Sequence, residues 1–117
     1  MPAAQVAMTV RDAEAGVRII DVKGEITSFA ELVLMEAYNQ ACSDDPCKAL
    51  ILNFTGLEYM NSGGIGLLVT LLIRAQRNGQ KLAAYGLTEH YRQILSLTRI
   101  DEAIGVYDDE AAAVAAA

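Results

Sequence analysis

The sequence predicts an α/β fold: a single domain, residues 1–117, with a mixed sheet of four to five strands and about four α-helices. Two short alternating segments open the chain, which indicates an antiparallel hairpin. A continuous apolar run at residues 49–52 indicates a buried central strand. Helical and strand patterns then alternate, in the order ββαβαβα(β)α, which predicts right-handed β–α–β units and parallel pairs.

Composition and charge narrow the functional classes. Apolar residues make up 53% of the chain and charged residues 21%, as in globular domains. The net charge is −6 and no basic cluster stands out, so nucleic acids and anionic membranes are disfavoured partners. The most apolar run, residues 65–73, is about half of a membrane span, and no signal peptide is visible. We therefore expect a cytoplasmic protein without direct membrane insertion.

Cys42, Cys47 and His90 are too few residues for a zinc site. In a reducing compartment we expect the cysteines to be ordinary thiols, on either side of a turn at residues 44–46.

The first half of the chain is predicted as follows. Strands at Gln5–Val10 and Val17–Lys23 are joined by a short polar turn. Ser28 and Glu31 have the spacing of a capping box, which predicts a helix over Phe29–Cys42. The apolar face of this helix consists of Ala30, Val33, Leu34, Ala37, Tyr38 and Ala41.

In the second half, a strand at Lys48–Phe54 and a loop at Thr55–Asn61 lead into a helix over Ser62–Asn78. Gly79 is expected to end this helix. The remaining elements are a strand at Gln80–Tyr85, a helix capped by Thr88, an edge strand at Ile104–Tyr107 and a terminal helix beginning at Asp108–Glu110.

Catalytic and nucleotide motifs are not found. Gly63, Gly64 and Gly66 follow a strand, but the Lys of a P-loop and the last glycine or alanine of a dinucleotide fingerprint are missing. Ser62 does not lie in a nucleophile elbow, because Met60 stands where glycine is needed. His90 is the only histidine. We expect that the protein is not an enzyme.

Ser62 has two interpretations. Its hydroxyl can cap the helix, or it can be a phosphorylation site, since a phosphate at a helix N-terminus meets unpaired N–H groups and the positive end of the dipole. Gly63 and Gly64 either allow close approach of a partner or allow tight packing of the helix start against the sheet.

The segment Asn53–Leu68, with Gly24-Glu25-Ile26 before the first helix, resembles the signature of STAS domains, the sulfate-transporter and anti-sigma-factor-antagonist family. The resemblance spans nearly the whole chain and implies a STAS-like fold. Three positions differ from the family pattern: Thr27 and Asn61 stand where Asp is usual, and Gly63 where Ser or Thr is usual.

The resemblance implies a non-enzymatic switch, an anti-sigma factor antagonist. Such a protein binds a serine kinase/anti-sigma factor of the histidine-kinase-like ATPase type, is released when the motif serine, Ser62 here, is phosphorylated, and is restored by a PP2C-type phosphatase. Nucleotide and magnesium belong to the kinase, so no cofactor is expected. The implied partner-binding residues are Gly24, Glu25, Thr27, Ser28, Asn61, Ser62, Gly63 and Gly64. The alternative is a non-phosphorylated STAS subunit or scaffold of a transporter or lipid-transport complex.

Overall fold

A five-stranded mixed sheet forms the centre of the structure, a computed structural model that describes residues 5–42 and 47–117. The strands lie in chain order across the sheet: β1 (Val6–Glu14), β2 (Val17–Ile26), β3 (Ala49–Met60), β4 (Lys81–Tyr85) and β5 (Gly105–Tyr107). β1 pairs with β2 antiparallel, and the other three pairs are parallel. The predicted fold class is confirmed.

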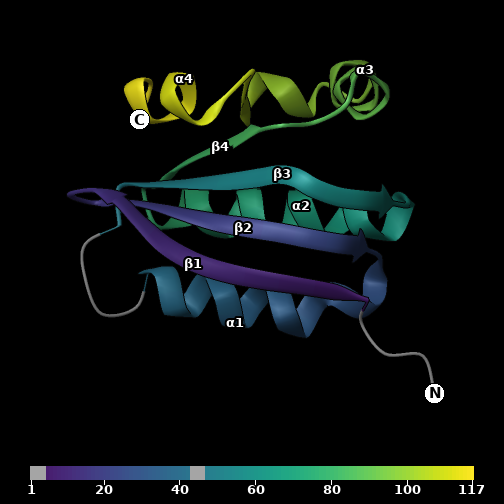
Figure 1. Cartoon of the computed structure of the whole chain (residues 1–117), viewed down its shortest axis with the longest axis horizontal. Helices are drawn as coiled ribbons and strands as arrows, with labels where there is room; N and C mark the ends of the chain where they lie inside the picture. The colour runs from purple at the N-terminus through teal and green to yellow at the C-terminus, as the bar shows by residue number, and fades with distance from the viewer. Residues whose placement is uncertain (1–4, 43–46) are drawn as a thin grey trace.

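Four α-helices pack on this sheet within the described part of the chain: α1 (Glu31–Cys42), α2 (Ser62–Arg77), α3 (Glu89–Leu97) and α4 (Glu110–Ala115). α1 lies along β1 and β2, α2 lies against β2 to β4, and α4 lies against β3 to β5 (Figure 1). Short 3₁₀ turns precede α1 and follow α3.

The two faces of β3 contribute to two separate cores. Leu50 and Leu52 join the large core shared with α1, α2 and α3, whereas Ala49 and Ile51 join the small core under α4. All four side chains are buried. The continuous apolar run therefore behaves as predicted, as a central strand covered on both sides.

Three strands are longer than predicted. β2 continues past Lys23 to Ile26. β1 continues to Glu14, because a tight turn at Gly16 (φ +77°) lets its polar end pair with the start of β2. β3 continues to Met60, and the expected loop at Thr55–Asn61 is mostly strand. β3 keeps its pairing with β2 through two register shifts, so the strand pair ends directly beside α2.

The helix caps differ from the predictions at α1. The expected capping box of Ser28 and Glu31 is wrong: the Thr27 hydroxyl accepts a hydrogen bond from the Phe29 N–H (3.2 Å) and caps the 3₁₀ turn, and α1 begins only at Glu31. Thr88 has the N-cap position of α3 without a side-chain hydrogen bond. Gly79 ends α2 as expected, with a left-handed φ of +68°.

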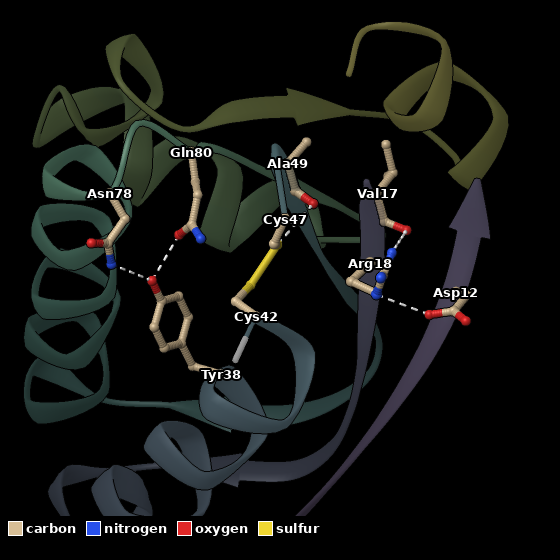
Figure 2. Close-up of a disulfide and its surroundings, with 9 residues drawn as sticks. All are labelled: Asp12, Val17, Arg18, Tyr38, Cys42, Cys47, Ala49, Asn78 and Gln80. Carbon is tan, nitrogen blue, oxygen red and sulfur yellow. Dashed lines mark hydrogen bonds and ion pairs between the residues drawn. A yellow bond between two sulfur atoms is a disulfide. The ribbon is translucent and has the colours of Figure 1, made fainter. Parts of the chain in front are cut away.

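Cys42 and Cys47 form a disulfide between the end of α1 and the start of β3 (Figure 2). The expectation of two free thiols is therefore wrong. Their Cα atoms lie 5.1 Å apart, within the range that a disulfide spans. The predicted turn at residues 44–46 lies outside the described residues.

Candidate functional site

The site predicted around Ser62 is built where β2 and β3 end side by side. Ile26 pairs with Met60, and the Asn61 N–H donates a hydrogen bond to the Ile26 carbonyl (3.3 Å). The segments that follow, one leading to α1 and the other to α2, therefore start next to each other. This placement explains how residues more than thirty positions apart in sequence form one surface.

Asn61, not Ser62, caps α2. Its backbone is extended (φ −103°, ψ −174°), and its side-chain oxygen accepts a hydrogen bond from the Gly64 N–H (3.0 Å). Ser62 is the first helical residue and its side chain is exposed. Within residues 5–42 and 47–117, its hydroxyl has no hydrogen-bond partner. The hydroxyl is thus accessible at the positive end of the α2 dipole.

The glycines beside Ser62 have different roles. A Cβ on Gly64 would lie 2.1 Å from the Ile26 carbonyl oxygen, so only glycine allows the start of α2 to pack against the end of β2. A Cβ on Gly63 would lie 3.1 Å from the Ser28 nitrogen, a tight contact but not an overlap. Gly66 has open space around it. Tight packing therefore accounts for Gly64.

The remaining predicted residues divide into two groups. Ser28 lies against Gly63 and is exposed, Thr27 holds the turn before α1, and Glu25 is exposed opposite Tyr59. Gly24 is not part of this surface. It is buried in β2 with φ +102°, and a Cβ there would lie 2.1 Å from the Gln5 carbonyl oxygen.

Exposed apolar side chains lie on the elements that meet at the turn, although none of them is among the predicted partner-binding residues. Val69 and Ile73 are 36% and 46% exposed, and Phe29, Leu32 and Tyr59 are between 47% and 68% exposed. On α2 the positions 62, 66, 69 and 73 follow helical spacing, so they form one outward stripe. The signal in the sequence was residues 65–73, which are apolar on nearly every side of the helix; such a helix cannot bury all of them against one sheet.

Tyr91 of α3 is a second residue that the sequence did not indicate. Its hydroxyl accepts a hydrogen bond from the Met60 N–H (2.9 Å), two residues before Ser62. The end of β3 is therefore held from both sides, by β2 and by α3.

Most of the titratable groups with shifted pKa values form a network on another part of the sheet, beside α4. Arg11 donates hydrogen bonds to Asp21 and Glu110, and these bonds lower the pKa of both carboxyls. Burial, together with the hydrogen bond to Glu110, raises the pKa of Tyr85 to about 12. This network fastens α4 to the sheet.

Neither a metal site nor a membrane span is found in the described segments. No three His, Cys, Asp or Glu side chains gather there in a way that could hold a metal ion. Likewise, within residues 5–42 and 47–117, no helix is both long and apolar enough to cross a bilayer.

Comparison with known proteins identifies the family. The STAS domain matches residues 8–113. The anti-sigma F factor antagonist of Paenibacillus polymyxa is 20% identical over 95 residues, which cover 81% of each chain. An anti-sigma factor antagonist from Mycobacterium paratuberculosis superposes with a TM-score of 0.79 at 22% identity, covering 98% of this chain and 97% of that one. The Bacillus cell fate determinant SpoIIAA in its phosphorylated form has a TM-score of 0.71 at 16% identity, covering 95% and 100%. The family match and the shared fold together show that this chain belongs to the STAS domain family.

Proposed function

We propose that this protein is an anti-sigma factor antagonist that binds an anti-sigma factor with serine kinase activity and is released when Ser62 is phosphorylated. The observation that carries the proposal is the state of the Ser62 hydroxyl: exposed, at the first position of α2, and free of hydrogen bonds to the described residues. Because Asn61 caps the helix, modification of Ser62 costs no capping bond.

The physical effect of the phosphate falls on binding rather than on folding. A phosphoserine carries a charge of about −1.5 to −2 at pH 7. At a helix N-terminus this charge is favourable for the helix itself. The surface around it, by contrast, is apolar and glycine-rich, and a partner that buries this surface would have to desolvate the phosphate.

The docking surface consists of the Ser62 turn and the apolar side chains beside it. The stripe of α2 offers Val69, the 3₁₀ turn before α1 offers Phe29, and the start of α1 offers Leu32. Exposed apolar groups of this kind mark protein–protein sites. Ser28, in the turn before α1, lies against Gly63 of α2 and so joins the two parts of the surface.

The proposed partners are an anti-sigma factor with kinase activity and a phosphatase. The curated relative is called an anti-sigma F factor antagonist, which supports an anti-sigma factor as the bound protein. The kinase is of the histidine-kinase-like ATPase type and holds ATP and magnesium, and a PP2C-type phosphatase removes the phosphate. The protein itself acts in the cytoplasm by binding, without catalysis.

The test is phosphorylation by the cognate kinase with ATP, followed by intact-mass measurement. We expect one phosphate on the wild type, none on Ser62→Ala, and one on Ser28→Ala, the matched serine across the turn. A wild type that gains no phosphate, or a Ser62→Ala variant that still gains one, contradicts the proposal. Stable co-purification of the unmodified protein with a membrane complex would instead support the transporter-subunit alternative.

A further inference from the structure

A groove of about 720 Å³ opens between α1 and α2, at the end of α2 opposite to Ser62. Its volume is in the range of small-molecule sites. Tyr38 lines it from α1, and Arg74 and Arg77 line it from α2. Asn78 and Gln80, which follow α2, close its end.

The groove holds two cations without acidic partners. Within residues 5–42 and 47–117, neither Arg74 nor Arg77 forms an ion pair, whereas Arg11, Arg92 and Arg99 each pair with a carboxylate. No described residue that lines the groove is an Asp or Glu. A helix C-terminus by itself favours cations. The chain as a whole has a net charge of −6, however, so a groove lined by two arginines and no described acid differs in sign from the rest of the protein.

A buried tyrosine holds the polar groups of the groove in place. Tyr38 is 5% exposed; its hydroxyl donates to the Gln80 side-chain oxygen (2.7 Å) and accepts from the Asn78 side-chain amide (2.8 Å) (Figure 2). The Arg74 guanidinium lies 5.8 Å from the centre of the Tyr38 ring, a cation–π contact. With its oxygen bonded to Tyr38, Gln80 keeps its amide N–H groups available as donors.

We infer that this groove is a binding site for an oxyanion, the phosphate or carboxylate group of a small organic molecule. Arg74 and Arg77 supply the charge, because guanidinium groups match such oxyanions in charge and in hydrogen-bond geometry. Gln80 supplies a neutral donor, and the half-exposed Ile73 supplies apolar contact for the organic part. The site is independent of Ser62 and of its phosphorylation.

The experiment is a titration of the full chain with inorganic phosphate, pyrophosphate and citrate, at fixed pH and constant ionic strength. NMR signals of the arginine Nε–H and of the Asn and Gln side-chain amides report binding. We expect saturable shifts at Arg74, Arg77 and Gln80. The phosphate and citrate arms distinguish a phosphoryl from a carboxylate ligand.

Matched variants separate a site from general charge screening. Arg74→Gln and Arg77→Gln should each weaken binding about tenfold, the effect of removing one charge-assisted hydrogen bond. Arg99→Gln removes the same charge from an exposed residue that pairs with Glu102, and should leave the affinity unchanged. The backbone amide spectrum checks that each variant is folded. Shifts that stay linear for all three anions, or an equal loss in Arg99→Gln, would overturn the inference.

Discussion

Asn61 is the N-cap of α2 and Ser62 carries the accessible hydroxyl, and the sequence alone could not assign these two roles. Both residue types are good N-caps, and which one caps depends on the position at which β3 ends. Because β3 continues to Met60, Asn61 takes the cap and Ser62 becomes the first helical residue. The family pattern usually has Asp at position 61; Asn accepts the same hydrogen bond from Gly64 without adding a charge beside the hydroxyl.

This division predicts unequal effects of two neighbouring substitutions. Asn61→Ala should lower the free energy of unfolding by about 1 kcal/mol, because the Gly64 N–H loses its acceptor. Ser62→Ala should change it by less than about 0.5 kcal/mol, as expected for an exposed side chain without a bond. Urea denaturation of both variants measures the difference, and a larger loss for Ser62→Ala would show that Ser62 is the cap.

The glycines of the turn allow a second comparison. Gly64→Ala should destabilise the fold by about 3 kcal/mol, because its Cβ overlaps the Ile26 carbonyl oxygen. Gly66→Ala should stabilise it by up to about 1 kcal/mol, since the Cβ meets open space and alanine is the better helix former. Thermal and urea unfolding measure whether the free energy of unfolding falls in Gly64→Ala and rises in Gly66→Ala. Equal effects at the two positions would mean that α2 does not pack against Ile26 as described.

At the scale of elements, the sequence predicted which segments pair but not how far they extend. The apolar run of β3 was identifiable because it lacks any polar residue. The second half, from Thr55 to Met60, contains glycine and polar residues, and it remains a strand only because β2 lies beside it. Such pairing between distant segments is not encoded in local periodicity. The tertiary contact of Tyr91 was not detectable for the same reason.

Tyr91 links α3 to the end of β3, and its removal should be costly. Tyr91→Phe leaves the buried Met60 N–H without its acceptor while keeping the ring, so we expect a loss of about 1–3 kcal/mol in the free energy of unfolding. Hydrogen exchange should also be faster at the Met60 amide. Tyr59→Phe removes a hydroxyl from an exposed neighbour and is the control. Slow exchange at Met60 in Tyr91→Phe would contradict the link.

At the scale of the whole molecule, the helices cover the two faces of the sheet unequally. The large core lies under α1, α2 and α3, whereas α4 covers only a small core on the other face. The order of elements, the mixed sheet and the helix count could be predicted from patterning. The network of Arg11, Asp21, Tyr85 and Glu110 could not, because its members come from four separate elements.

This network predicts how stability depends on acid. Arg11 lowers the pKa of Asp21 and Glu110 below their ordinary values of 3.8 and 4.5. A carboxyl with a lowered folded pKa stabilises the fold above its unfolded pKa, and this contribution is lost as the pH falls through the folded value. The free energy of unfolding, measured from pH 7 to pH 2.5, should therefore begin to fall near pH 4.5.

Arg11→Gln tests the cause of that loss. Without the guanidinium the pKa values of Asp21 and Glu110 return toward their ordinary values. The free energy of unfolding should then fall less steeply with decreasing pH than in the wild type. Arg99→Gln removes an equal charge from an exposed ion pair and should leave the pH dependence of the free energy of unfolding unchanged. If the free energy of unfolding of Arg11→Gln runs parallel to that of the wild type from pH 7 to pH 2.5, the network is not the source of the acid sensitivity.

A negative charge at Ser62 should control partner binding without disturbing the fold. Isothermal titration calorimetry of the cognate anti-sigma factor with wild type, Ser62→Asp and Ser62→Asn measures this control, because the two variants differ in charge and hardly in size. We predict that Ser62→Asp weakens binding about tenfold or more, or about 1.4 kcal/mol, while Ser62→Asn stays close to the wild type. Both variants should keep the wild-type unfolding midpoint, since Asn61 remains the cap. Equal affinities of Ser62→Asp and the wild type would show that charge at Ser62 does not control binding.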